Sequence, residues 1–185
     1  MTDLTKDKDA MEVWAQTMID EMHIDPSEEI GYPPVAISMG EATMNGQTYP
    51  VPIGTYGNFS FVQAPPKSKK TFFISLLGSV FLSGKNNFGG KMQGHRKDEC
   101  LVHFDTEQGK FHAQKVFRRV LDMSPSEEIG CYHTFGLRTM SYKDRINFIE
   151  YYLYNCLENK AGVVIIDGIA DLVSGEGIRF NEFEM

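Results

Sequence analysis

The sequence contains few cysteines, and none of the three belongs to a CxxC pair. Cys100, Cys131 and Cys156 each lie within an apolar pattern, and an odd number of cysteines fits a reducing compartment better than a disulfide scaffold. Because free cysteine is among the most buried residue types, we expect core thiols. The five histidines show neither an HExxH motif nor a paired Cys/His pattern. We therefore expect no structural metal.

The chain also lacks a long hydrophobic run and an excess of basic charge. Its N-terminus has no apolar segment of the signal-peptide kind, and its longest apolar run, residues 71–82, is too short and too interrupted by Ser and Gly to span a bilayer. The formal net charge of -7 excludes a broadly basic surface, so any nucleic acid would be bound by a local patch. These absences predict a cytoplasmic protein with no membrane partner.

The length of the chain is typical of one domain. With 185 residues, 42% of them hydrophobic, it can bury roughly 70% of its unfolded surface in one core. Near the start, large apolar residues recur at steps of three and four, which predicts a helix. These residues are Met11, Trp14, Met18 and Met22. We expect residues 1–33 to form this helix and a proline-containing linker, and residues 34–185 to form the main domain.

The main domain is predicted to begin with a β-hairpin over residues 34–57. Asn45 and Gly46 supply the two positive-φ positions of a tight type I′ turn. The predicted short strands around that turn are residues 35–39, 42–44 and 47–51.

Strand and helix patterns alternate from residue 58 onwards. The predicted strands are residues 59–62, 100–105, 131–135 and 162–167, and the predicted helices begin at residue 71 and cover 107–123 and 141–159. The last strand has four consecutive apolar residues without polar alternation, which indicates burial on both faces of a parallel sheet. The alternation therefore predicts an α/β fold with right-handed crossovers.

A long segment, residues 84–97, connects the first predicted helix to the second predicted strand. It is longer than most connections in compact domains and is rich in basic residues. These are Lys85, Lys91, Arg96 and Lys97. One interpretation is a solvated mobile loop. The other is a flap that contacts phosphates or single-stranded nucleic acid around Phe88.

The segment QAPPKSKKTFF, residues 63–73, carries the clearest chemical pattern. Lys70 and Thr71 are the pair that closes a phosphate-binding loop of the GxxxxGK[ST] type, although the two glycine positions of that pattern hold Ala64 and Lys69. Such a loop holds phosphate through successive backbone N–H groups and the positive end of the following helix. The residues that keep these donors are Lys67, Ser68, Lys69, Lys70 and Thr71.

The alternative interpretation of this segment is a basic turn that caps a helix. Lysines at a helix N-terminus are unfavourable by about 0.3 to 1 kcal/mol per charge unless an anion is present. The alternative therefore has a mild energetic cost.

Polar residues follow the ends of two further predicted strands, where an open parallel sheet binds its ligands. Asp167 ends the last strand and suits Mg²⁺ beside a phosphate chain. Glu107 follows the second strand and suits a general base, which would polarise an attacking water. Both interpretations have structural alternatives: Asp105 can cap a helix with Gln108, and Glu107 in a first turn favours the helix dipole.

Three segments together resemble the motifs of RecA-like ATPases: QAPPKSKKTFF the Walker A loop, LVHFDTEQ the strand-end glutamate, and VVIIDGIADL the Walker B strand. The similarity is greatest to the AAA-type ATPases of bacterial mobile elements, which are themselves similar to DnaB and RepA replicative helicases. It covers residues 34–173.

The resemblance implies a three-layer RecA-like P-loop NTPase core that binds ATP and Mg²⁺. It implies that Lys70 and Thr71 bind phosphate and Mg²⁺, that Asp167 is the Walker B aspartate, and that Glu107 is the catalytic base. Single-stranded DNA and further copies of the chain are the macromolecular partners it suggests.

The resemblance also implies that the ATPase core is incomplete. RecA-like motors continue after Walker B with strands that carry a sensor residue and DNA-binding loops, whereas only 18 residues follow Asp167 here. We therefore expect an exposed sheet edge that favours self-association, and slow hydrolysis at best. The alternative function is a non-catalytic interaction or regulatory protein with a degenerate nucleotide site.

Overall fold

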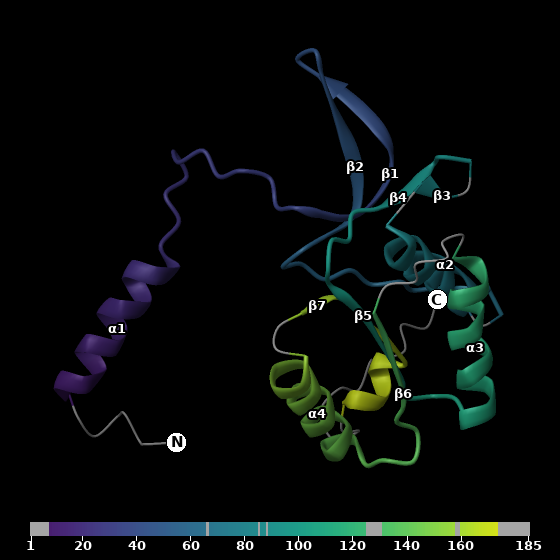
Figure 1. Cartoon of the computed structure of the whole chain (residues 1–185). Helices are drawn as coiled ribbons and strands as arrows, with labels where there is room; N and C mark the ends of the chain where they lie inside the picture. The colour runs from purple at the N-terminus through teal and green to yellow at the C-terminus, as the bar shows by residue number, and fades with distance from the viewer. Residues whose placement is uncertain are drawn as a thin grey trace, which may run out of the picture. The chain divides into compact units, whose positions relative to one another are not determined.

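The computed structural model describes residues 8–65, 67–84, 86–87, 89–124, 131–157 and 160–173. Contacts divide the chain into two units, Met1–Tyr32 and Pro33–Met185. In the first unit, α1 (Lys8–Met22) confirms the predicted N-terminal helix. The described part of the second unit contains two sheets and three α-helices (Figure 1). No helix among the described residues is long and apolar enough to cross a membrane.

The first sheet is built on the predicted hairpin. Strands β1 (Val35–Met44) and β2 (Gln47–Thr55) pair antiparallel, and the turn between them has φ of 52° at Asn45 and 78° at Gly46, as a type I′ turn requires. The two short strands predicted before the turn form one continuous strand, β1. The pairing of β1 with β2 contains register shifts, which bend β1.

The predicted loop over residues 84–97 contributes two more strands to this sheet. Strands β3 (Asn86–Asn87) and β4 (Met92–Gly94) extend it in the order β2-β1-β4-β3. Met92 is buried, and a Cβ on Gly94 would collide with the backbone of α2 (Lys70–Ser83), so β4 packs closely on that helix. The prediction of a free loop is therefore wrong for residues 92–94. Lys85 and Phe88 lie outside the described residues.

The second sheet is parallel, as predicted for an α/β fold. Its strands β5 (Cys100–Asp105), β6 (Tyr132–Gly136) and β7 (Ala161–Asp167) lie in the order β6-β5-β7. Every residue of the central strand β5 is buried. Strand β7 is less buried than predicted, because Val164 is 38% exposed and no described strand pairs with its far edge.

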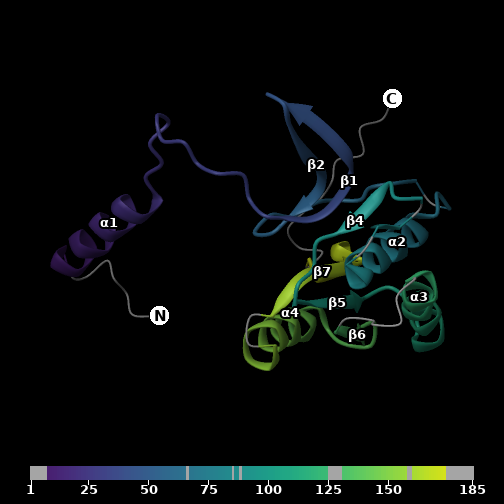
Figure 2. The same cartoon turned by 45° about the horizontal axis from the view of Figure 1, so that its top comes forward.

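Helices cover both faces of the parallel sheet, which gives three layers (Figure 2). On one face, α2 (Lys70–Ser83) and α3 (Lys110–Met123) form a core with β5 through side chains that include Phe81, Leu101 and Val120. On the other face, α4 (Tyr142–Tyr151) continues into the π-helix η2 (Tyr152–Cys156). A second core there includes Phe104 and Ile149.

The strand predicted at residues 59–62 does not form. Residues 58–65 are irregular, and Phe59 and Phe61 are 84% and 71% exposed. A strand needs backbone partners as well as an apolar pattern, and Pro65 and Pro66, which follow Gln63 and Ala64 shortly after this run, have no N–H to donate to a ladder. The start of α2 is therefore preceded by irregular, exposed chain.

The helix boundaries also differ from the predicted ones. Helix α3 begins at Lys110, three residues after the predicted start, and leaves Glu107 in a turn. Helix α4 begins after Ser141, whose hydroxyl accepts the N–H of Asp144 at 3.2 Å, as the predicted cap requires. It gives way to η2 at Tyr152.

The cysteines depart from the prediction of three core thiols. Leu101 pairs with Tyr132 in the ladder between β5 and β6, so the preceding residues Cys100 and Cys131 are neighbours, and they form a disulfide. Cys156 is free but exposed. The sequence could not show this pair, because 31 residues separate the two cysteines and only the strand register brings them together.

Candidate functional site

A pocket of about 740 Å³ opens where α2 begins, and it collects most of the site residues predicted from sequence. It is lined by Ala64, Pro65, Lys67, Ser68, Lys69, Lys70, Thr71, Phe72, Glu107 and Arg119. Four of these side chains are cationic and one is anionic. The pocket is therefore electropositive and suited to a polyanion.

The backbone of the loop has the shape of an anion-binding concavity. Lys67 and Lys69 both adopt φ of 65°, the left-handed conformation that glycine adopts without strain. The alternation of left-handed and other residues turns successive N–H groups toward one side of the chain. Within the described residues, the N–H groups of Lys70 and Thr71 at the start of α2 have no acceptor.

Lys70 and Thr71 both reach the end of β7. The Lys70 Nζ atom lies 3.3 Å from Asp167 Oδ1, and the Thr71 hydroxyl donates to Asp167 Oδ2 at 3.4 Å. Asp167 is 2% exposed, and its Oδ1 has no hydrogen bond of good geometry. The contact with Lys70 is thus an ion pair without an aligned hydrogen bond. The predicted phosphate-binding and Walker B residues therefore meet in the fold.

Asp105 is a second buried carboxylate at this edge, and it stands opposite Asp167 in the ladder between β5 and β7. Its Oδ1 accepts the N–H groups of Glu107 at 3.1 Å and Gln108 at 2.7 Å, whereas its Oδ2 has no hydrogen-bond partner in the described part of the chain. Burial raises the pKa of Asp105 above its ordinary value; the Gln108 N–H opposes this, and the charge of Asp167 adds to it.

Asp105 thus holds the turn that carries Glu107. It does not cap α3 directly, which was the structural alternative given for it from the sequence. Gly109 takes the position before that helix.

The turn that carries Glu107 is fastened to the end of β7. The hydroxyl of Thr106 donates to Gly168 O at 2.7 Å, and its N–H donates to Asp167 O at 3.0 Å. Gly168 has φ of 98°, and a Cβ there would collide with the side chains of Thr106 and Glu107. Glu107 therefore lies directly against Gly168, with its carboxylate at the exposed mouth of the pocket.

Hydroxyl and carboxylate oxygens are the donors that Mg²⁺ prefers, and Thr71 and Asp167 supply one of each at the same place. The buried Asp167 Oδ1 and Asp105 Oδ2, which have no hydrogen-bond partner among the described residues, provide further oxygen lone pairs there. The residues present therefore fit a hard divalent cation.

Arg119 is a pocket residue that the sequence did not indicate. Arg119 lies on α3 with its guanidinium 5.6 Å from the centre of the Phe72 ring, and both residues line the pocket. Only the packing of α3 against α2 shows that this part of the helix faces the loop.

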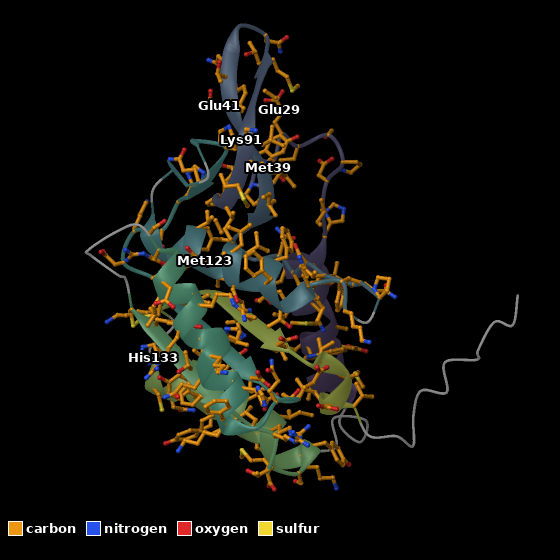
Figure 3. All side chains as sticks on the ribbon, turned by 90° about the vertical axis from the view of Figure 1, so that its right-hand side faces the viewer. Glu29, Met39, Glu41, Lys91, Met123 and His133 are labelled. Atoms are coloured by element: carbon orange, nitrogen blue, oxygen red, sulfur yellow. A yellow bond between two sulfur atoms is a disulfide. The ribbon has the colours of Figure 1, made fainter. Side chains whose placement is uncertain are left out.

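A separate cluster lies at the opposite end of β5. The sulfur atoms of Cys100 and Cys131 and a ring nitrogen of His133 lie within 4.8 Å of one another. Figure 3 shows His133 near the margin of the molecule, below Glu41 of β1 and Lys91, which directly precedes β4. The expectation of no metal-ligand cluster rested on sequence spacing, which does not detect ligands from two neighbouring strands.

Comparison with known proteins does not place this chain in a family: no protein-family model, curated protein or solved structure matches it. Its site is therefore interpreted from its own geometry.

Proposed function

We propose that this chain is an Mg²⁺-dependent ATP-binding domain of the RecA-like type that serves DNA replication or mobilisation, with slow hydrolysis at best. The observation that carries the proposal is the convergence of Lys70, Thr71 and Glu107 in one electropositive pocket, with Asp167 in contact with the first two. These residues come from three separate segments, and their order along the sequence is the one that the Walker-type resemblance implies.

The loop residues have separate tasks in this proposal. The N–H groups of Lys70 and Thr71 and the positive end of α2 bind phosphate oxygens, and the Lys70 ammonium neutralises their charge. Asp167 and the Thr71 hydroxyl hold Mg²⁺, which supplies charge neutralisation to the phosphate chain when bound. Glu107 at the pocket mouth orients the attacking water and accepts its proton.

The ion pair between Lys70 and Asp167 gives this binding a specific consequence. Lys70 neutralises the buried Asp167 carboxylate in the ligand-free chain. When Mg²⁺ and phosphate enter together, the cation takes over Asp167 and the lysine turns to the phosphate. We expect phosphate to bind weakly without Mg²⁺, because a lysine that turns to the phosphate leaves the charge of the buried Asp167 unbalanced.

Calorimetric titration of the chain with ATP tests the binding. Wild type should bind in the presence of Mg²⁺, Lys70→Ala should bind at least about tenfold more weakly, and Lys115→Ala, an exposed lysine of α3 outside the pocket, should match wild type. Equal affinities of Lys70→Ala and wild type would contradict the proposal.

Turnover separates an ATPase from a pure binder. If Glu107 acts as the base, Glu107→Gln should bind ATP with unchanged affinity and hydrolyse it at least about 100-fold more slowly. Equal turnover of the two proteins excludes Glu107 from that role.

A non-catalytic interaction protein is the second candidate, and the exposed Phe59 and Phe61 favour it. Their rings are 5.5 Å apart, and both face solvent directly before the loop, where a partner could cover them. Absence of ATP binding by wild type, together with binding of a partner protein that Phe59→Ser abolishes, would select this function.

Single-stranded DNA binding stays a prediction. Arg96, one of the four basic residues behind it, uses its guanidinium to donate to Leu82 O and Lys97 O. Among the described residues of this segment, Lys91 and Lys97 are then the candidates for contacts with DNA phosphates. The salt dependence of single-stranded DNA binding tests this prediction.

A further inference from the structure

We propose that Cys100, Cys131 and His133 bind a zinc-like divalent cation when the disulfide between the two cysteines is reduced. This corner of the parallel sheet would then hold either a disulfide or a metal ion. The inference is independent of the proposed nucleotide site. Cys100 and Asp105 are the two ends of β5, so roughly 16 Å of strand separates the two places.

The strand register places all three ligands on one face of the sheet. Leu101 pairs with Tyr132 and Val102 pairs with His133, so Cys100 lies beside Cys131. Residues two apart on a strand point to the same side, which puts the side chain of His133 on the side of Cys131. The result is the group of three ligand atoms within 4.8 Å.

His133 is already oriented as a ligand. Its Nε2 lies 2.7 Å from Cys131 Sγ, and its Nδ1 lies 2.6 Å from the hydroxyl of Tyr152 on η2. Metal-binding histidines typically have their second ring nitrogen fixed in this way, which sets the tautomer and the ring orientation. A disulfide sulfur carries no proton, so in the oxidised chain Nε2 is the donor and Nδ1 accepts from Tyr152. In the metal-bound chain Nε2 turns its lone pair to the cation, and Nδ1 donates to the Tyr152 oxygen.

The donor set selects the cation. Two thiolates and one imidazole suit Zn²⁺ or Co²⁺ in tetrahedral coordination and do not suit Mg²⁺. Cys100 is buried, His133 is partly buried and Cys131 is exposed, so the fourth position opens to solvent and water can fill it. Three protein ligands and one water form a recognised zinc geometry.

The exchange between the two states balances. A dithiol passes two electrons and two protons to the Cys100–Cys131 bond, which yields two thiols and the disulfide of the reductant. Binding of the cation then releases the two thiol protons, since thiolates are the ligands. Reoxidation to the disulfide removes two of the three ligands and releases the metal.

Cobalt absorption spectroscopy on the full chain, without a histidine tag, tests the proposal. The protein is reduced with a phosphine, which becomes its oxide with oxygen from water and adds no competing thiol. Co²⁺ alone should then give an intense thiolate-to-metal band and tetrahedral visible bands, Zn²⁺ should abolish them, and excess Mg²⁺ should leave them unchanged. The oxidised protein should give no such bands.

Variants assign the ligands. Cys131→Ser should lose the thiolate bands, and Tyr152→Phe should bind Co²⁺ about 10-fold more weakly. Cys156→Ser removes the remaining thiol, which is exposed, and should match wild type.

Circular dichroism of each sample reports folding. The proposal is overturned if Cys131→Ser keeps the bands, or if Cys156→Ser loses them. It is also overturned if the reduced wild type gives no Co²⁺ bands, whether it stays folded after reduction or loses its dichroism and does not regain it when Co²⁺ is added.

Discussion

At the scale of single residues, the loop holds two lysines in a conformation that disfavours side chains. Lys67 and Lys69 have φ of 65°, which costs an L-residue about 1–2 kcal/mol each. Such strain tends to cluster at ligand-binding sites. Lys67, and Lys69 at a glycine position of the phosphate-loop pattern, thus add positive charge at the expense of stability.

Replacing Lys69 with glycine should relieve this strain. We expect Lys69→Gly to raise the free energy of unfolding by about 1 kcal/mol and to keep ATP binding, because the loop donors are backbone groups. Urea denaturation measures the difference. The matched control, Lys115→Gly in the middle of α3, should lower stability by about 1 kcal/mol. A destabilised Lys69→Gly would contradict the account of strain.

His103 should make the fold sensitive to acid. It is fully buried on β5, its Nδ1 lies 3.1 Å from the Tyr132 hydroxyl, and its Nε2 has no hydrogen-bond partner. Burial lowers the pKa of His103 to about 4, although the charge of Asp167 opposes this. In the unfolded chain, the His103 ring therefore binds a proton near pH 6.5. In the folded chain, it binds that proton only near pH 4.

The stabilisation from neutral His103 is fully present above about pH 6.5 and is lost as the pH falls to about 4. The free energy of unfolding lost over this range is on the order of 3 kcal/mol. Urea midpoints across this range should fall less steeply in His103→Gln than in wild type. His112→Gln, an exposed histidine of α3, should keep the wild-type slope. Parallel profiles for His103→Gln and wild type would refute the assignment.

At the scale of elements, the turn after β5 and the end of β7 position Glu107 together. Gly168 has a positive φ and lies against Thr106 and Glu107. We expect Gly168→Ala to cost about 2–3 kcal/mol of stability, from backbone strain and the displaced side chains, and to slow any ATP turnover.

Gly46 is the matched control for Gly168. It also has a positive φ, of 78°, but its Cβ would meet nothing within 4 Å. Gly46→Ala should therefore cost only the backbone strain, about 1–2 kcal/mol, and leave turnover unchanged. Equal effects of the two substitutions in urea denaturation and in turnover would contradict the positioning role of Gly168.

Elements with strong local signals were predictable from the sequence. Strands β5 and β7 of the parallel sheet contain apolar runs, and Ser141 with Asp144 marks the start of α4. The strand predicted at residues 59–62 failed because an apolar pattern does not supply a ladder partner. The strand at residues 92–94 was missed because three residues carry almost no periodic signal and depend on pairing with β1.

The site was predictable where its chemistry depends on strand ends. Glu107 follows β5 and Asp167 ends β7, so the parallel pairing of these strands places both residues at one edge of the sheet, while Lys70 and Thr71 begin α2. The pocket role of Arg119, the disulfide and its histidine were not predictable, because they depend on helix packing and strand register between segments distant in the sequence.

At the scale of the whole molecule, one covalent link ties two strands of the parallel sheet. The Cys100–Cys131 disulfide closes a loop of 31 residues, for which chain entropy predicts about 4 kcal/mol of stabilisation. Reduction in the absence of metal should lower the free energy of unfolding by this amount, as measured in urea. Cys131→Ser should be insensitive to the reductant. An unchanged wild-type midpoint after complete reduction would contradict this estimate.

The far edge of β7 is a second property of the whole unit. No described strand pairs with it, and Val164 and Ile169 are exposed nearby. An unpaired edge of this kind favours association with another chain. Self-association is thus part of the functional hypothesis and makes protein concentration a variable to hold constant.

The most direct test of the central claim is the thermal unfolding midpoint with and without Mg²⁺ and ATP. At 100 times its dissociation constant, a bound ligand stabilises by about 2.7 kcal/mol, or roughly 5–10 °C for a chain of this size. Wild type should show this shift, and Lys70→Ala should lose most of it relative to its own ligand-free midpoint. No shift in wild type, or a full shift in Lys70→Ala, would contradict the nucleotide-binding account.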